Sequence, residues 1–193
     1  MKFLLKYSYI FLCSFTLYYT REFIKTEAMN INDITFKTPE ATFNYRVGAV
    51  IIDSGSILMV KNSGTSFYYS VGGRVKLGES AREAVLREAY EETRIIFEID
   101  RLLFIHENFF TLESNCEYIH EVALFFLLKS KSDLNESLIG SFLEEYGDVT
   151  LHWLPIADLG AFHVYPDFFI NEIKDLPENV VYYITRNDKT IRI

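Results

Sequence analysis

Three glutamates at helical spacing are the residues of this sequence best suited to chemistry. At about 100° per residue, Glu88, Glu91 and Glu92 share a sector of roughly 100° on one helix face. Like charges at this spacing repel by a few tenths of a kcal/mol per pair, which a bound cation would offset. Oxygen ligands suit a hard ion, Mg²⁺ or Mn²⁺, better than zinc. Glutamate clusters are also common as solvated surface, so the neighbouring residues must decide.

Those neighbours predict a helix placed against a sheet. Ser80 is a plausible N-cap and Glu83 stands three residues later, as in a capping box, so we expect a helix to about Thr93. Small apolar residues precede the glutamates on the same face and would allow close packing: Ala81, Ala84 and Val85. Gly72 and Gly73 come just before the helix and permit backbone conformations that are closed to other residues.

The same stretch resembles the Nudix box, Gly-x5-Glu-x7-Arg-Glu-U-x-Glu-Glu-x-Gly-U, in which U is a bulky apolar residue. The matching residues are Gly73, Glu79, Arg87, Glu88, Ala89, Glu91, Glu92 and Ile95. Every charged position of the motif is present at the right spacing. One position departs from the family pattern, because Arg94 stands where the family has glycine.

The resemblance implies a role for each matched residue. It makes Glu88, Glu91 and Glu92 metal ligands, together with the backbone carbonyl of Gly73. It makes Arg87 the partner that holds the carboxylates in place, and Glu79 a support of the loop and helix. The general base is Glu91 or Glu92 in this interpretation. Because the family also takes its base from other loops, four further candidates remain, each of which more often is a surface residue: Glu107, Glu121, Glu144 and Glu145.

Arg94 leaves two alternatives open. If it takes the left-handed conformation that glycine commonly has after a helix, it costs roughly 1–2 kcal/mol. Otherwise the helix ends in a different way. Either outcome affects stability and loop geometry rather than the metal ligands.

Predicted strands and helices alternate along the rest of the chain. This order fits the α/β class and, within it, the mixed-sheet α/β/α sandwich of the Nudix fold. We expect a single domain over residues 29–193. We expect strands at Tyr45–Asp53, Ile57–Lys61, Phe67–Val71, Ile95–Phe110, Glu117–Leu128, Leu151–Leu154 and Val180–Thr185. We also expect a short helix within Leu134–Glu145 and another at Asp167–Asp175, with Pro166 at its first position.

Residues 1–28 differ from the rest of the chain. Lys2 and Lys6 precede an apolar run from Tyr7 to Tyr19, which is short for a membrane span and lacks a recognisable cleavage site. Three alternatives remain open: a start wrongly assigned ahead of Met29, a membrane-associated leader, or a cleaved signal. Membrane association is expected only if this segment is retained.

Net charge and cysteine content indicate which binding partners and which cellular compartment to expect. A net charge of −8 argues against nucleic-acid binding but not against small anions, since a bound metal reverses the local field. The two cysteines, Cys13 and Cys116, are too far apart in sequence to suggest a disulfide framework, so a cytoplasmic location is the natural expectation. The sequence does not indicate an oligomeric state.

The function implied by the resemblance is that of a pyrophosphohydrolase acting on phosphorus-containing acid anhydrides. The expected substrate is a nucleoside diphosphate linked to another moiety, and the expected cofactor is Mg²⁺, with Mn²⁺ as the alternative. The subgroup markers known for the ADP-ribose, NADH and coenzyme A types are missing: no proline lies between the box and Pro155, and the single tryptophan is Trp153. A Nudix-fold domain that binds nucleotides without hydrolysing them, as a sensor or regulator, is the alternative.

Overall fold

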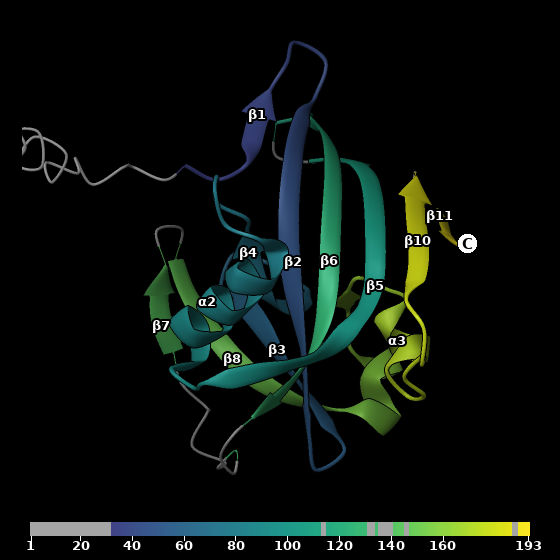
Figure 1. The fold of residues 1–193 in the computed structure, drawn as a ribbon. Helices are drawn as coiled ribbons and strands as arrows, with labels where there is room; N and C mark the ends of the chain where they lie inside the picture. The colour runs from purple at the N-terminus through teal and green to yellow at the C-terminus, as the bar shows by residue number, and fades with distance from the viewer. Residues whose placement is uncertain (1–31, 113–114, 131–133, 135–140, 145–146, 187–188) are drawn as a thin grey trace, which may run out of the picture. The chain divides into compact units, whose positions relative to one another are not determined.

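A computed structural model describes residues 32–112, 115–130, 134, 141–144, 147–186 and 189–193 (Figure 1). The predictions for residues 1–28 and for a start at Met29 lie outside these residues. All described residues belong to one unit, Asn32–Ile193. Within the described ranges, no helix is both long enough and apolar enough to cross a bilayer.

The described residues form a mixed sheet of eleven strands. The strands are β1 (Thr35–Lys37), β2 (Thr42–Asp53), β3 (Ser56–Asn62), β4 (Tyr68–Arg74), β5 (Phe97–Thr111), β6 (Tyr118–Ser130), β7 (Ser141–Glu144), β8 (Gly147–Pro155), β9 (Val164–Tyr165), β10 (Val181–Arg186) and β11 (Lys189–Arg192). The order is β11-β10-β5-β6-β2-β4-β3-β8-β7, with β1 added to β2 and β9 to β4. Parallel pairing joins β2 to β6, β5 to β10 and β4 to β9.

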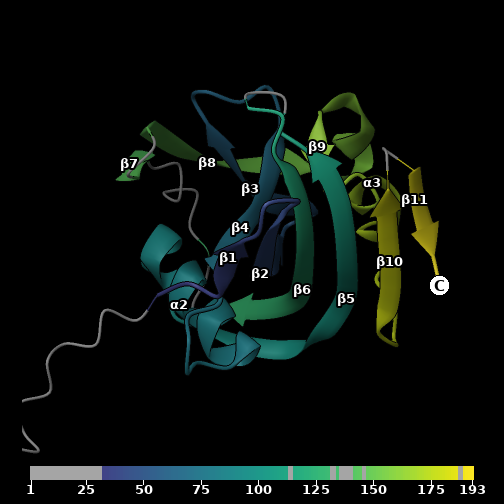
Figure 2. The ribbon, with the colours of Figure 1, turned by 90° about the horizontal axis from the view of Figure 1, so that it is seen from above.

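One face of the sheet packs against helix α2 (Ala81–Thr93). Val47, Ala49 and Val71 of β2 and β4 are buried in a cluster with Ala84 and Val85 of the helix. The opposite face packs against the 3-10 helix η2 (Ile156–Ala161) and α3 (Phe169–Glu172), around the buried rings of a second cluster that includes Phe104, Phe125, Phe168 and Phe169. Figure 2 shows α2 and α3 on opposite sides of β5 and β6, so the predicted α/β/α layering is present.

Every predicted strand overlaps an observed one, and four of them were predicted to begin one or two residues too early. The turn predicted after Asp53 is a two-residue hairpin loop, in which Ser54 (φ 47°) and Gly55 (φ 77°) both have left-handed backbones. Two positive φ angles are the mark of a type I′ turn, whose twist matches that of the flanking strands. The loop therefore fixes the register of β2 with β3.

The predicted helices differ from the observed elements. Residues 141–144, near the end of the segment Leu134–Glu145 in which a short helix was expected, form strand β7 and pair with β8, and residues 135–140 lie outside the described residues. The helix expected at Asp167–Asp175 is shortened to Phe169–Glu172, and Pro166 follows a cis peptide bond instead of occupying a first helical position. Strands β1, β9 and β11 and helix η2 were not predicted.

Candidate active site

The loop from β4 to α2 is closed by a capping box at the start of the helix. The Ser80 hydroxyl accepts a hydrogen bond from the Glu83 backbone N–H (3.3 Å), and the Glu83 carboxylate accepts one from the Ser80 N–H (2.8 Å). These two bonds satisfy donors that a helix start otherwise leaves open. The predicted N-cap is confirmed, and it fixes the residue at which the carboxylate-bearing helix begins.

Small side chains bring this helix close to the sheet. Ala84, Val85 and Ala89 have no exposed surface and pack on β2 and β4. The predicted packing role is confirmed for Ala84 and Val85, whereas Ala81 is only partly buried. The face of α2 that carries Glu88 and Glu92 thereby meets the glycine pair of β4.

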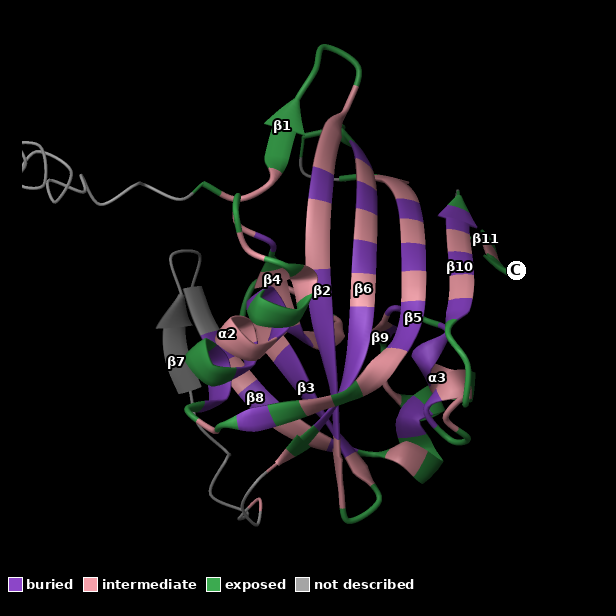
Figure 3. Cartoon of the chain, viewed as in Figure 1, coloured by how far each residue is buried: buried purple, intermediate pink, exposed green. Residues whose placement is uncertain are grey.

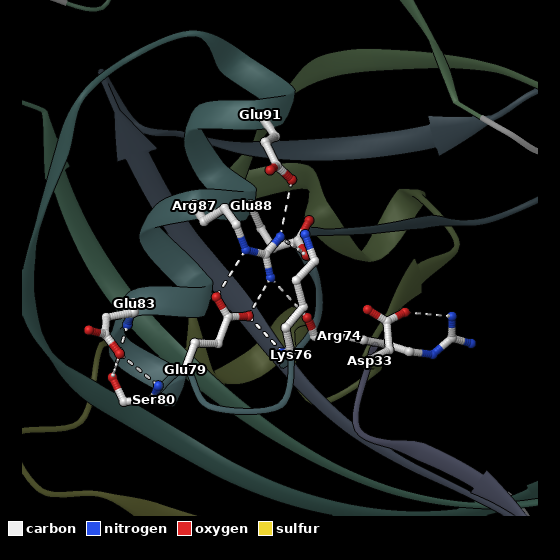
Figure 4. A network of polar contacts seen from close by, with 9 residues as sticks. All are labelled: Asp33, Arg74, Lys76, Glu79, Ser80, Glu83, Arg87, Glu88 and Glu91. Atoms are coloured by element: carbon white, nitrogen blue, oxygen red, sulfur yellow. Dashed lines mark hydrogen bonds and ion pairs between the residues drawn. The ribbon is translucent and has the colours of Figure 1, made fainter. Parts of the chain in front are cut away.

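Arg87 gathers three carboxylates (Figure 4). Its guanidinium donates two bonds to Glu79, from Nε to Oε2 (3.0 Å) and from Nη2 to Oε1 (2.6 Å). Its Nη1 donates to Glu88 Oε1 (2.6 Å) and to Glu91 Oε2 (3.1 Å), and its Nη2 also donates to the backbone carbonyl of Arg74 (3.1 Å). All five N–H groups of a guanidinium can be used in this arrangement. Arg87 therefore links the start of the box to the carboxylates of the helix.

The charges in this network influence one another. The hydrogen bonds from Arg87 lower the pKa of the Glu79 carboxyl, and the bond from the Lys76 backbone N–H to Glu79 (2.7 Å) adds to the effect. Burial raises the pKa of Glu88, although the hydrogen bond from Arg87 opposes that shift. The bonds to Glu79 and Glu88 raise the pKa of Arg87, which stays charged. Glu79 is thus held as the anionic anchor of the network.

The two glycines contact the helix carboxylates in different ways. Gly72, at φ 146°, donates its backbone N–H to Glu92 Oε1 (3.1 Å), and the Glu92 side chain is buried. A Cβ atom on Gly73 would lie 2.4 Å from Cδ and Oε1 of Glu88, so the carboxylate rests against the glycine Cα. Gly73 itself has no positive φ, and the absence of a side chain is what the site requires there.

Arg94 adopts the left-handed conformation, with φ 61° and ψ 18°. Its backbone N–H donates to the Tyr90 carbonyl (2.8 Å), and its guanidinium lies over the Tyr90 ring at 5.9 Å from the centroid. The first of the two alternatives for this residue is therefore confirmed. The helix ends as it would with glycine, at a strain cost of roughly 1–2 kcal/mol, and the carboxylates keep their positions.

The donor types fit a hard divalent ion, but the carboxylates do not converge on one point. Among the described residues, no three side chains of the His, Cys, Asp or Glu type form a ready metal cluster. Glu88 and Glu91 each direct one oxygen to Arg87, and Glu92 directs one to Gly72. The three carboxylates thus lie on one helix but are held by different partners.

Two of the outside candidates for a base, Glu107 and Glu121, contact residues outside this network. Glu121 of β6 is buried, 3.8 Å from Arg46 Nη1. Glu107 of β5 lies 4.0 Å from His120 Nε2, and its hydrogen bond to Tyr182 raises the pKa of that tyrosine. Glu144 has no described side chain, and Glu145 lies outside the described residues.

Backbone groups are the part of the network that sequence reasoning missed. The Arg74 carbonyl and the Lys76 N–H join the carboxylates through the loop, and the Gly72 N–H holds Glu92. Each of these groups lies between the first glycine and the first glutamate of the motif or next to it. Only the spacing of the motif signals them, because backbone groups carry no residue signature.

Comparison with known proteins agrees with the fold and the motif. The model of the NUDIX domain family matches residues 42–173. Among curated proteins, nothing matches this chain. Among solved structures, a mutator MutT protein from Bacillus halodurans has a TM-score of 0.55 at 17% identity, covering 77% of this chain and 97% of its own.

Two further structures are similar at lower scores. A NUDIX hydrolase from Nitrosomonas europaea has a TM-score of 0.49 at 24% identity, covering 68% of this chain and 86% of its own. An ADP-ribose pyrophosphatase from Streptococcus suis has a TM-score of 0.47 at 17% identity, covering 74% and 98%. The family model covers more than half of the chain, including the whole box. The chain therefore belongs to the Nudix family.

Proposed function

We propose that this enzyme hydrolyses the diphosphate linkage of a nucleoside diphosphate joined to another moiety, with Mg²⁺ as its ion and Mn²⁺ as a substitute. The proposed ligands are Glu88, Glu91, Glu92 and the Gly73 carbonyl. The observation that supports it best is the arrangement of these residues: one helix brings three carboxylates to a glycine pair, and Arg87 ties two of them to Glu79.

A divalent ion at this place would neutralise phosphate charge and lower the pKa of a bound water. Arg87 and Glu79 keep the carboxylates at their positions while the substrate binds. Glu91 is the better candidate for the base, because its side chain is 49% exposed whereas Glu92 is 7% exposed. Glu91 takes the proton of the attacking water, a new P–O bond forms at one phosphorus, and the bridging P–O bond breaks to release the other phosphate.

The conformation of Arg94 argues against the alternative, a nucleotide-binding sensor without hydrolase activity. A helix end displaced by the missing glycine would have favoured a degenerate site. The left-handed Arg94 instead leaves the helix end in place, which supports the hydrolase.

The test is a panel of nucleoside diphosphate derivatives incubated with Mg²⁺ or Mn²⁺, with products identified by mass spectrometry. We expect two phosphate-terminated products from at least one derivative, and no turnover after chelation. Glu98→Gln is the control variant, since Glu98 is an exposed glutamate at the start of β5. Calorimetric binding of nucleotide and metal without any turnover would instead favour the sensor.

A further inference from the structure

Two arginines lie side by side next to the glycine pair. Arg46 of β2 is directly opposite Arg74 of β4 in the antiparallel register. Directly opposite residues have Cβ atoms about 5 Å apart on one face, and like charges there destabilise the pair. The sheet therefore holds two positive charges together at a cost, one residue beyond Gly73.

Both arginines face away from the carboxylates of α2. Val47 and Gly73 are paired with each other and face the helix, so alternation turns Arg46 and Arg74 to the other face. In Figure 4 the Arg74 side chain leaves the carboxylate network, although its backbone carbonyl accepts a bond from Arg87. The carboxylates of α2 thus lie against one face of β4, and the arginine pair of β2 and β4 lies on the other.

The carboxylates that pair with these two arginines lie beyond hydrogen-bond distance. The Arg46 Nη1 to Glu121 Oε2 distance is 3.8 Å, and the Arg74 Nη1 to Asp33 Oδ2 distance is 3.7 Å. Arg74 Nε also donates to Asn44 Oδ1 (3.2 Å). A guanidinium has five N–H donors, so within the described residues these contacts leave donors of both side chains open to a further partner.

The face next to the pair carries polar residues where a core is expected. Asn44, Glu121 and Asn108 stand in one register row across β2, β6 and β5, and all three are buried. Figure 3 shows buried bands, in purple, along these three strands. Within the part of the chain that the structure describes, Oδ1 of Asn108 has no hydrogen-bond partner. A buried polar atom without a partner costs free energy, and such exceptions are typical of functional sites.

Beyond Ser70, β4 has a partner strand on one edge only among the described strands. The pairing of β4 with β3 and β9 ends at Ser70, so Val71–Arg74 pairs with β2 alone among the described strands. The other edge of this segment carries no described strand. The carboxylates of α2 and the arginine pair therefore border the same free edge from opposite sides.

We propose that Arg46 and Arg74 form a phosphate-binding pair, which holds oxygens of the substrate's diphosphate group on the side of β4 that faces away from α2. The planar guanidinium fork matches phosphate geometry, and an anion between the two side chains removes their repulsion. Asn44, Glu121 and Asp33 orient the pair through the contacts given above. This inference rests on the proposed function, since it assigns a subsite of the same reaction.

The test compares Arg46→Gln, Arg74→Gln and the double variant with Arg101→Gln. Arg101 is a matched control on β5, paired with Asp100 (2.6 Å) and 37% exposed, against 34% and 42% for the side chains of Arg46 and Arg74. With a substrate that the wild type hydrolyses, we expect each single variant to raise KM about tenfold and to change kcat by less than about threefold. Arg101→Gln should change neither parameter.

A second measurement does not depend on turnover. Calorimetry with inorganic pyrophosphate and Mg²⁺ should show a Kd about tenfold weaker in each variant and unchanged in the control. Arg46→Lys and Arg74→Lys keep the charge near Glu121 and Asp33, so they cover the case in which a glutamine variant does not fold, and they should recover only part of the affinity.

Unchanged KM and unchanged pyrophosphate affinity in folded variants would overturn the phosphate-binding pair while leaving the hydrolase intact. A wild type that hydrolyses no diphosphate refutes the proposed function instead. In that event the pyrophosphate affinities of the variants still decide the inference.

Discussion

The variant Gly73→Ala should reduce catalytic activity much more than it reduces the stability of the fold. A Cβ atom there would lie 2.4 Å from Cδ and Oε1 and 2.6 Å from Oε2 of Glu88. These atoms are the end of a flexible side chain, so Gly73→Ala is accommodated when the Glu88 carboxylate moves away. The backbone of Gly73 has no positive φ, so alanine adds no backbone strain.

The magnitude follows from what the displaced carboxylate loses. Its 2.6 Å bond to Arg87 Nη1 is made by side chains with about a fifth or less of their surface exposed, and such a bond contributes about 1–2 kcal/mol. Gly72→Ala is the contrasting neighbour, because its Cβ would lie 2.2 Å from the Val47 backbone oxygen at a φ of 146°. A backbone cannot swing aside, so that variant should lose about 3 kcal/mol or more of unfolding free energy.

Urea denaturation and steady-state kinetics with Mg²⁺ test the pair. Gly73→Ala should lower the unfolding free energy by about 1–2 kcal/mol and kcat/KM by about a hundredfold, since a shift of about 1 Å in a reacting group has such an effect. In a Glu88→Ala background, the same Gly73→Ala change should cost close to nothing in stability, because the group that it displaces is gone.

Two outcomes would refute this reasoning. One is a Gly73→Ala enzyme with wild-type kcat/KM, which would mean that the position of Glu88 does not matter for turnover. The other is an equal stability loss for Gly73→Ala with and without Glu88, which would show that the methyl group meets something other than this carboxylate.

Three further predictions concern the helix, its end and the far side of the sheet. Glu91→Gln and Glu92→Gln should each abolish most turnover with little change in the circular dichroism spectrum, because each removes charge at nearly constant shape, and near-wild-type rates in both would contradict the assignment. Arg94→Gly should be about 0.5–1 kcal/mol more stable than Arg94→Ala in thermal melts, since glycine relieves the left-handed strain at φ 61° but gains entropy when unfolded, and equal melts would contradict that account. Burial lowers the pKa of His106 to about 4, so the unfolded chain takes up a proton below pH 6.5 that the folded protein refuses. The unfolding free energy should therefore fall by about 1.4 kcal/mol per pH unit from pH 6.5 to 4, relative to His106→Gln, and parallel pH profiles would exclude this contribution.

The parts of the fold that the sequence predicted well are those determined by neighbouring residues. The start of α2 follows from the capping box at Ser80 and Glu83, which lies within one turn. The hairpin at Ser54 and Gly55 follows from turn residues that tolerate left-handed backbones. The contacts around Arg87 were also accessible, because the spacing of the box places its partners on one helix face and one loop.

The parts that were missed depend on residues far away in sequence. Strand β11 exists because it pairs with β10, and β9 consists of two residues that pair with β4. Strand β7 at residues 141–144 was likewise not predicted, and it is stabilised by its pairing with β8. Alternation also shows that a strand has two faces without showing which one is covered, and the buried polar row could not be foreseen for that reason.

The buried polar row of Asn44, Glu121 and Asn108 lies close to the candidate site. On the opposite face of the same strands, Phe36 stacks on Phe43, Phe43 meets His120 edge to face, and His120 stacks on Phe109. The covered face carries Asn44, Glu121 and Asn108 in the adjacent row. Phe36 is 58% exposed, and full burial of its ring would stabilise the fold by about 1.5–3 kcal/mol, so this end of the sheet gives up stability. This end of the sheet, with its buried polar residues, lies beside the edge of β4 that has no described partner strand. The carboxylates of α2 and the arginine pair border that edge, so the polar row is consistent with an anionic ligand binding there.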